Sequence, residues 1–335
     1  MERRNFLKMS AVLAATASMN LQASASSQID SAWYRRNRKF VALPMGKVAY
    51  VEHGHGPAAL FIHGYPLNGY QWRGALERLH GHRRCIAPDV LGMGYSQAHD
   101  TKAITPPLQA EMLAALLDRL HVDSVDLVAN DSGGLLAQLF IARYPQRVRS
   151  LLLTNCDVDE NSPPPQFLPF IELAREGKFV DQTIMPQLKN KDLARSAEGL
   201  GGVAYTYPQH LSDETIDAYF RPMVASAVSK AQVNQYAASM KVNYLPAIRE
   251  DLHRWKGAAR MVWGMKDELF PVKWAEWLDR TLPGSRGIRR VEGANLFFPE
   301  EMPELIAEEA EKLWTGGGDV IPEKPRVSSV RDTAL

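Results

Sequence analysis

The sequence is poor in cysteine, balanced in charge and free of long apolar runs. Two cysteines among 335 residues are too few for a zinc cluster or a disulfide-rich scaffold. Lysine and arginine number 39 against 38 acidic residues, which offers no basic surface for nucleic acid. No stretch approaches the ~20 apolar residues that span a bilayer. The nine histidines are scattered without a metal-binding spacing, so we expect neither a metal nor a cofactor.

The composition is that of a globular protein, 45% hydrophobic and 23% charged. Short runs rich in Val, Ile, Leu and Ala, bounded by Gly, Pro or Asp, predict eight strands. Several of these runs are apolar without alternation, as expected for strands buried on both faces of a parallel sheet. They lie at 40–43, 47–52, 59–62, 85–87, 124–129, 150–154, 259–263 and 288–292.

Helical segments separate many of these strands. The clearest is 106–120, which Thr105 is placed to cap and in which leucines recur at helical spacing. The other helical segments lie at 70–79, 133–144, 271–281 and 303–314. The alternation predicts an α/β core, residues 26–156 and 257–314, with a mainly parallel eight-stranded sheet and helices on both faces. Residues 157–256 are helical and rich in proline, and they predict a helical cap.

The two ends of the chain differ from this core. Arg3 and Arg4 precede a short apolar run and an A-x-A cleavage site at Ala25, an order typical of a signal peptide in residues 1–25. The arginine pair resembles a twin-arginine export signal, so we expect a periplasmic or secreted protein that has no membrane attachment after cleavage. The alternatives are a disordered basic amino terminus and translation that starts at a later Met. Residues 315–335 have no apolar period and predict a disordered tail.

An oxidising compartment raises the question of a disulfide. Cys85 and Cys156 both lie at the ends of predicted strands and are the two available thiols. Because free cysteine is commonly buried as a small apolar side chain, we expect two buried free thiols.

A strand that runs directly into a helix carries the strongest chemical signal. A polar residue at such a sharp turn is the layout of a nucleophile elbow, which needs small residues two places before and after the nucleophile. Asp131 as the nucleophile puts Ala129 and Gly133 at those places, whereas Ser132 would put the bulkier Asn130 at the first. We therefore favour Asp131 and keep Ser132 as the alternative nucleophile.

Two further loops follow predicted strands, where ligands of open α/β sheets bind. Residues 63–66 are H-G-Y-P, in which Gly64 permits a close turn and the Tyr65 N–H is placed to face an oxyanion. With Asp131 as the nucleophile, the Ser132 N–H is the second donor of this oxyanion hole. Residues 89–96 are D-V-L-G-M-G-Y-S, which lacks the third glycine of a dinucleotide fingerprint and predicts a structural loop.

The H-G-x-P, D-x-x-G-x-G-x-S and elbow motifs together resemble the α/β-hydrolase family, over residues from about 40 to 314. An Asp at the elbow followed by x-Gly-Gly is similar to the branch that holds haloalkane dehalogenases and epoxide hydrolases. The resemblance implies the α/β-hydrolase fold, an Asp131 nucleophile and, as its acid, Asp267 in the segment 261–271. Asp157 matches an alternative acid site used in part of that branch.

The sequence departs from this pattern where the family needs a histidine. Leu296 occupies that position, and no histidine follows His253. In an Asp mechanism, a His base activates the water that hydrolyses the alkyl-enzyme ester, and a Ser mechanism needs the base even earlier. The loss therefore weakens Ser132 more than Asp131. His63, next to the elbow, and His253 are the candidate substitutes.

The substrate class is also open. Dehalogenases of this branch usually have a Trp beside the nucleophile, where this chain has Ser132. Epoxide hydrolases protonate the epoxide oxygen with cap tyrosines, for which Tyr205, Tyr207 and Tyr236 are candidates.

Three functions follow from these motifs. The first is an exported hydrolase that attacks a carbon–halogen, epoxide or ester bond of a small, largely apolar molecule with Asp131. The second is a serine esterase that uses Ser132. The third is a non-catalytic member of the fold that binds a ligand or a partner, because fold does not imply function. The sequence does not indicate an oligomeric state.

Overall fold

The computed structural model describes residues 29–316, so the predicted signal peptide and most of the predicted tail lie outside the described residues. In this part of the chain, nine strands form one sheet in the order β1-β2-β4-β3-β6-β7-β8-β9, with β5 paired to β2. The strands are β1 (Arg38–Leu43), β2 (Gly46–His53), β3 (Ala58–Ile62), β4 (Arg84–Pro88), β5 (Gln97–Ala98), β6 (Val125–Asp131), β7 (Val148–Cys156), β8 (Ala258–Gly264) and β9 (Ser285–Val291).

The sheet is mixed. Strands β3, β4, β6, β7, β8 and β9 are parallel to their neighbours among these six, whereas β2 is antiparallel to β1, β4 and β5. All eight predicted strands are present, and the sequence analysis missed only β5. This strand has two residues, too few to show a periodic pattern.

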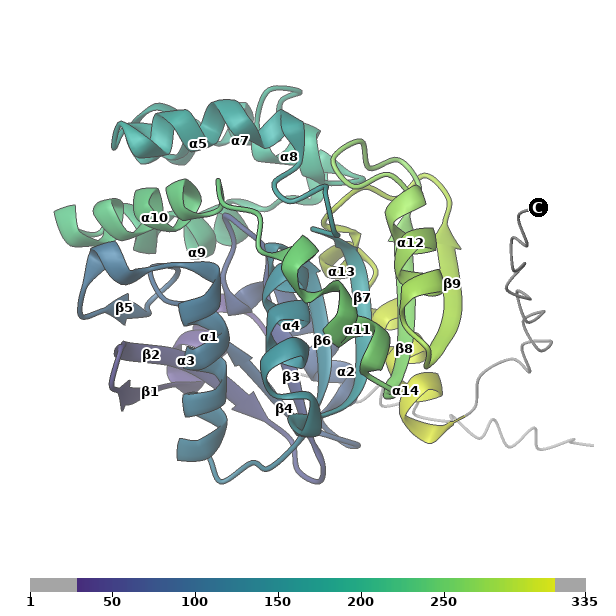
Figure 1. Ribbon diagram of the computed structural model, residues 1–335. Coiled ribbons are helices and arrows are strands. Elements are labelled where there is room, and N and C mark those ends of the chain that lie inside the picture. Colours follow the sequence, from purple (N-terminus) through teal and green to yellow (C-terminus); the bar gives the residue numbers. More distant parts are fainter. Residues whose placement is uncertain (1–28, 317–335) are drawn as a thin grey trace, which may run out of the picture.

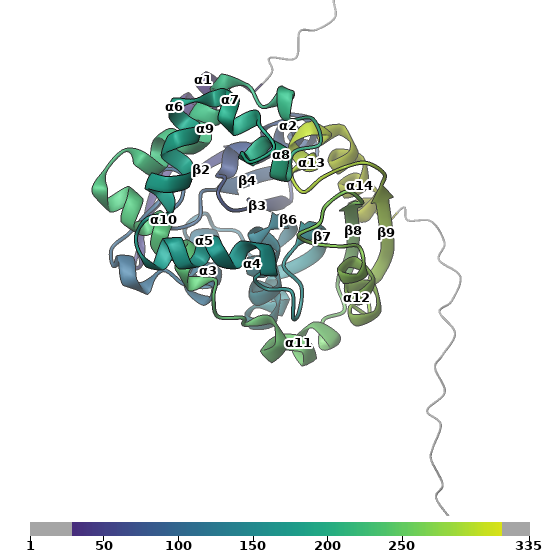
Figure 2. The same ribbon diagram turned by 90° about the horizontal axis from the view of Figure 1, so that it is seen from above.

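Helices cover both faces of the sheet (Figure 2). One face is covered by α2 (Arg73–Leu79) and α14 (Pro303–Thr315), and the other by α3 (Pro106–Arg119), α4 (Ser132–Arg143) and α12 (Lys273–Thr281). As predicted, the Thr105 side chain accepts a hydrogen bond at the start of α3, and Pro106 occupies its first turn. Helix α14 includes Thr315, which the sequence placed in the tail. Outside the segment between β7 and β8, the described residues form two further short α-helices, α1 (Ser31–Asn37) and α13 (Phe298–Glu301).

The chain between β7 and β8 is helical, as expected for residues 157–256. It contains α5 (Leu168–Arg175), α6 (Met185–Lys189), α7 (Lys191–Arg195), α8 (Leu200–Ala204), α9 (Asp213–Val224), α10 (Ala227–Ser239) and α11 (Arg249–Arg254), and a π-helical turn at Val180–Ile184. Helices α5 to α10, which we call the inserted helices, lie above one end of the sheet (Figure 1). Helix α11 instead packs against α4 and α12, as part of the layer beside the sheet.

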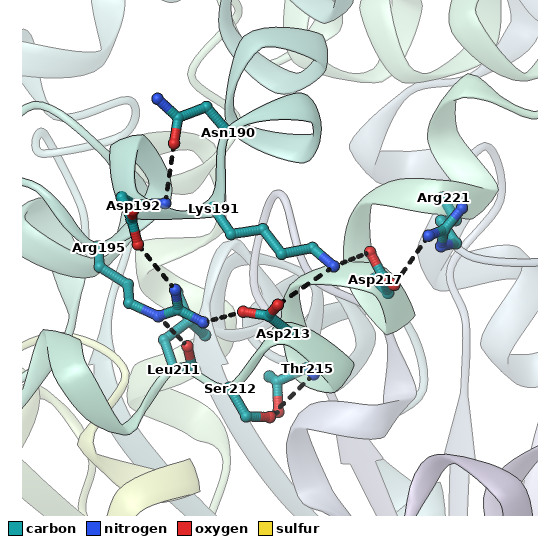
Figure 3. A network of polar contacts seen from close by, with 10 residues as sticks. All are labelled: Asn190, Lys191, Asp192, Arg195, Leu211, Ser212, Asp213, Thr215, Asp217 and Arg221. Atoms are coloured by element: carbon teal, nitrogen blue, oxygen red, sulfur yellow. Dashed lines mark hydrogen bonds and ion pairs between the residues drawn. The ribbon is translucent and has the colours of Figure 1, made fainter.

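Charged side chains join the inserted helices to one another (Figure 3). Lys191 on α7 pairs with Asp217 on α9 at 2.9 Å, and Arg195 on α7 pairs with Asp213 at the start of α9. Asp217 also accepts from Arg221, one turn later on α9. These pairs are in contact with solvent, with side chains 20–67% exposed, so each contributes about 1 kcal/mol or less. They fix how α7 and α9 lie together.

The two cysteines are buried free thiols, as preferred from the sequence. Cys85 lies on β4 and Cys156 on β7, with β3 and β6 between them. Three strand spacings amount to ~14 Å, about twice the Cα separation that a disulfide allows. Within residues 29–316, no helix is both long enough and apolar enough to cross a membrane.

Candidate active site

The elbow is formed where β6 ends and α4 begins. Every residue of β6 is buried, and Asp131 at its end has φ +54° and ψ −132°, a backbone conformation that is costly for any residue but glycine. A Cβ on Gly133 would lie 2.4 Å from the Ile62 carbonyl oxygen, so only glycine lets α4 start this close to β3. The strained residue of the turn is therefore Asp131, and Ser132 is the first residue of the helix.

Two backbone N–H groups hold the Asp131 carboxylate. The Tyr65 N–H donates to Asp131 Oδ2 at 2.6 Å, and the Ser132 N–H also donates to this carboxylate. A Cβ on Gly64 would lie 2.6 Å from Asp131 Cβ, so glycine is what admits this close approach. The structure thus brings together the predicted nucleophile and both predicted oxyanion donors.

The two candidate acids have different surroundings. Asp131 pairs with Cys156 in the register of β6 and β7, which places Asp157 beside it at the next position. Asp131 and Asp157 both line one cavity, whereas Asp267 is not among the residues that line it. The Leu269 N–H donates to Asp267 Oδ1 at 2.8 Å, and Asn155 Nδ2 donates to Oδ2 at 2.9 Å.

All three carboxyl groups are buried, and burial is the main reason that their pKa values are raised. The pKa of Asp131 lies well above its ordinary value because of burial and the nearby Asp157, although the Ser132 and Tyr65 N–H groups oppose this rise. Burial raises the pKa of Asp157 to about 7 and that of Asp267 to about 6. Asp157 therefore exchanges a proton near neutral pH.

Neither candidate histidine faces the cavity. His63 Nε2 accepts from the Val90 N–H at 3.0 Å, so its Nδ1 is protonated and donates to the Gly64 carbonyl at 2.9 Å. Burial lowers the pKa of this neutral ring to about 4. His253 is exposed on α11. The side chain at the expected histidine position, Leu296, does line the cavity and is buried.

A chain of buried amide side chains, which the sequence analysis missed, lies beneath the site. Gln71 accepts from the Gly64 N–H and donates to Asn130, at 3.0 and 2.6 Å. Asn130 donates to the carbonyls of Asn155 and Leu296, and Asn155 Nδ2 donates to Asp267. These hydrogen-bonded amides fix the loops after β3, β6, β7 and β8 relative to one another. The sequence signal for it is a polar residue near the end of an otherwise apolar strand, as at Asn130 and Asn155.

The cavity has a volume of about 510 Å³, and its lining residues come both from the loops at the strand ends and from the inserted helices. Most of its wall is apolar, including Phe167, Phe179 and Phe220, and the π-helical turn contributes part of it. It opens near Phe170 and Val203, which line it and are also solvent-exposed. Its size and lining suit a small, largely apolar molecule.

Of the three candidate cap tyrosines, only Tyr236 lies near the nucleophile. Its hydroxyl and that of Ser132 lie beside each other and have no other hydrogen-bond partner among the described residues. Tyr205 instead donates to Glu300 at 2.6 Å, and Tyr207 is exposed.

The remaining motif loop is structural, as expected. The Asp89 carboxylate accepts from the Gly69 and Tyr95 N–H groups, at 2.9 and 2.8 Å. Across residues 29–316, no cluster of three or more His, Cys, Asp or Glu side chains is arranged to hold a metal ion.

Comparison with known proteins shows which family this sequence matches. Residues 57–301 match the model of the alpha/beta hydrolase fold. A haloalkane dehalogenase of Agrobacterium fabrum is 37% identical over 118 residues, 34% of this chain and 38% of that enzyme. Epoxide hydrolase 2 of Siraitia grosvenorii is 40% identical over 101 residues, 30% of this chain and 32% of that enzyme. The chain thus matches about a third of the length of these relatives.

A solved structure extends the likeness over most of the chain. The haloalkane dehalogenase of Bradyrhizobium elkani superposes with a TM-score of 0.68 at 24% identity. The superposition covers 83% of this chain and 99% of that one. It shows a shared fold.

Proposed function

Because the chain belongs to the α/β-hydrolase fold family, we propose that it hydrolyses a small, largely apolar electrophile by nucleophilic attack from Asp131. The observation that carries this proposal is the placement of the Asp131 carboxylate, which projects from the strained elbow, lines the apolar cavity and accepts from the Tyr65 N–H. The bond attacked is a carbon–halogen, epoxide or ester bond.

The geometry supports a two-step reaction. With Oδ2 held by the Tyr65 N–H, Oδ1 is the attacking oxygen and forms a covalent ester with the substrate. Water then attacks the ester carbonyl carbon, and the Tyr65 and Ser132 N–H groups stabilise the negative charge that develops on the held oxygen. The inserted helices act as the cap of this site and limit the access of bulk water.

A serine esterase is the weaker alternative. Ser132 Oγ is buried beside Tyr236, and no histidine lines the cavity within the described residues. A serine hydroxyl needs a base before it can attack, whereas an ionised aspartate does not.

A ligand-binding protein without catalysis is the second candidate. Two observations favour it: no imidazole from residues 29–316 lines the cavity, and burial together with Asp157 raises the pKa of Asp131. A protonated Asp131 donates a hydrogen bond but does not attack. The cavity would then hold a small apolar ligand.

Intact-protein mass spectrometry distinguishes these functions. The protein is incubated with 1-bromohexane, 1,2-epoxyhexane and 4-nitrophenyl butyrate, beside Asp131→Ala and Ser132→Ala. We expect a covalent adduct or product in the parent and in Ser132→Ala, and neither in Asp131→Ala. An adduct lost only in Ser132→Ala establishes the esterase. Tight binding of these molecules without adduct or product in any variant establishes the binding protein.

A further inference from the structure

We propose that Asp157 is the proton-transfer group of this site, and that it makes an epoxide a better substrate than a haloalkane. This inference rests on the proposed function of Asp131. It assigns to a carboxyl group on the neighbouring strand the role that Leu296 does not perform.

The first support is position. Asp131 ends β6, Cys156 is its register partner at the end of β7, and Asp157 follows directly. Both carboxyl groups line the same cavity, and Asp157 is only 5% exposed. The Ser162 side chain is hydrogen-bonded to Asp157 and holds it in place. Asp267, the other buried acid here, has both oxygens occupied by protein donors and does not line the cavity.

The second support is the set of donors around Asp131. Among the described residues, no Trp, Lys or Arg lines the cavity, so neither an indole N–H nor a cation is present to hold a halide. The Ser132 and Tyr236 hydroxyls lie beside the Asp131 carboxylate, are buried, and have no further hydrogen-bond partner in the described part of the chain. Hydroxyl groups donate hydrogen bonds to an oxygen, and a protonated carboxyl group gives it a proton. These groups therefore suit a substrate whose leaving oxygen becomes an alcohol, as in an epoxide.

The third support is the proton balance of the site. The titratable groups that face Asp157 are Asp131 from β6, Tyr236 from α10 and Cys156 on its own strand. Asp267 follows β8, on the side of β7 opposite to β6. Two neighbouring buried carboxyl groups share one proton near neutral pH, because two charges are costly there. Attack uses the arrangement in which Asp131 is ionised and Asp157 carries the proton. In this arrangement the two N–H donors stabilise the Asp131 charge and a neutral Asp157 no longer repels it, while burial still raises the pKa of Asp131.

The reaction then balances with Asp157 as acid and as base. Asp131 Oδ1 attacks an epoxide carbon, the carbon–oxygen bond of the ring breaks, and the departing oxygen takes the Asp157 proton. This gives a hydroxyalkyl ester of Asp131 and an Asp157 carboxylate. That carboxylate takes a proton from water as its oxygen attacks the ester carbonyl carbon. The ester bond breaks, and the diol oxygen takes the proton of the new Asp131 carboxyl group. Asp131 is again ionised and Asp157 protonated, and one water has been consumed.

Asp157→Asn tests this assignment because it preserves size and removes proton transfer. The control is Glu160→Gln, an exposed carboxylate three residues further along the chain. Both are compared with the parent on 1,2-epoxyhexane and 1-bromohexane, by quenched intact mass and by product assay. Circular dichroism verifies that each variant is folded.

In Asp157→Asn, we expect bromohexane to form the Asp131 ester, because bromide leaves without a proton. That ester should persist at least 100-fold longer than in the parent, and epoxide opening should slow by ~10²–10⁴-fold. Added imidazole, small enough for the cavity, should accelerate ester hydrolysis in Asp157→Asn. In the parent, epoxide opening should decline above about pH 7, where Asp157 loses its proton, while alkylation by bromohexane does not.

Two results overturn the inference and leave the proposed function intact. One is an Asp157→Asn ester that hydrolyses at the parental rate, and the other is unchanged epoxide turnover. If the parent and Glu160→Gln give neither ester nor product with either reagent, the proposed function of Asp131 itself fails, and this inference fails with it.

Discussion

Leu296 lies at the position where the sequence motifs predict a histidine, and two hydrogen bonds hold its backbone without involving its side chain. The Leu296 N–H donates to Asn295 Oδ1 at 2.9 Å, and its carbonyl accepts from Asn130 Nδ2 at 3.1 Å. The side chain is 2% exposed and lines the cavity that Asp131 also lines. The side chain at the predicted histidine position is thus an apolar group that lines the same cavity as Asp131.

Restoring histidine at this position should therefore restore proton transfer. In the Asp157→Asn background, Leu296→His should shorten the lifetime of the bromohexane-derived ester by ~10²-fold or more, because an imidazole is a general base at neutral pH. Leu296→Gln is the control, as it adds polarity without a base. Time-resolved intact mass gives both lifetimes. Equal lifetimes for the His and Gln variants would show that this position does not reach the ester.

At the same scale, the sequence indicated which residues meet at the elbow, but not which carboxyl group shares their cavity. Asp131, Tyr65 and Ser132 follow from short motifs whose residues are adjacent in the chain. The sequence favoured Asp267 over Asp157, and that comparison depends on contacts that no motif shows. Asp267 has its oxygens occupied by the Leu269 and Asn155 N–H groups and does not line the cavity that Asp157 lines.

At the scale of elements, one buried carboxylate ties the inserted helices to the core. Glu300 on α13 accepts from Arg73 Nη1 and the Tyr205 hydroxyl, both at 2.6 Å, and from the Tyr219 hydroxyl at 2.8 Å. These partners come from α2, from the loop after α8 and from α9. The next residue, Glu301, accepts the Thr206 and Tyr207 N–H groups. Glu300 and Glu301, which follow the loop that contains Leu296, thus attach this loop to the inserted helices.

Glu300→Gln should loosen this attachment. The substitution leaves the Arg73 charge without its ionic partner. We expect the free energy of unfolding to fall by about 3 kcal/mol. This value is at the low end for buried ion pairs because Arg73 is partly exposed. Hydrogen exchange should accelerate in α9 and in the loop before it, and denaturant unfolding should show the loss of stability. The control is Glu304→Gln, which removes an exposed partner of Arg78. It should change neither the hydrogen exchange of α9 nor the stability to denaturant. Unchanged exchange in α9 of Glu300→Gln would contradict this role.

Elements were predictable where their pattern is local. The eight longer strands follow from apolar runs, and α3 from its cap and its leucine spacing. Strand β5 has two residues and pairs only with β2, so its existence depends on a tertiary contact. The place of α11 beside α4 and α12 likewise depends on packing, because its six residues carry too short a pattern to show which layer they join.

At the scale of the whole molecule, the fold is compatible with an oxidising compartment. Its two thiols are buried and separated by two strands, so neither pairs with the other nor meets solvent oxidants readily. Mature protein recovered from such a compartment should therefore contain two free cysteines, and alkylation in denaturant without a reductant should label both.

We propose export by the twin-arginine route, which carries folded proteins, on the basis of the order of charged, apolar and small residues in 1–25. Expressed in a bacterium with that route, the protein should appear in the periplasm or medium as a chain that begins at Ser26. Cleavage after Ala25 leaves 335 − 25 = 310 residues, which intact mass measures directly. Replacing Arg3 and Arg4 together by lysine should retain the uncleaved chain in the cytoplasm, because the route recognises the arginine pair. An exported, cleaved double-lysine variant would assign the segment to the general secretory route, and an uncleaved parent would make it a basic terminal segment of the folded protein.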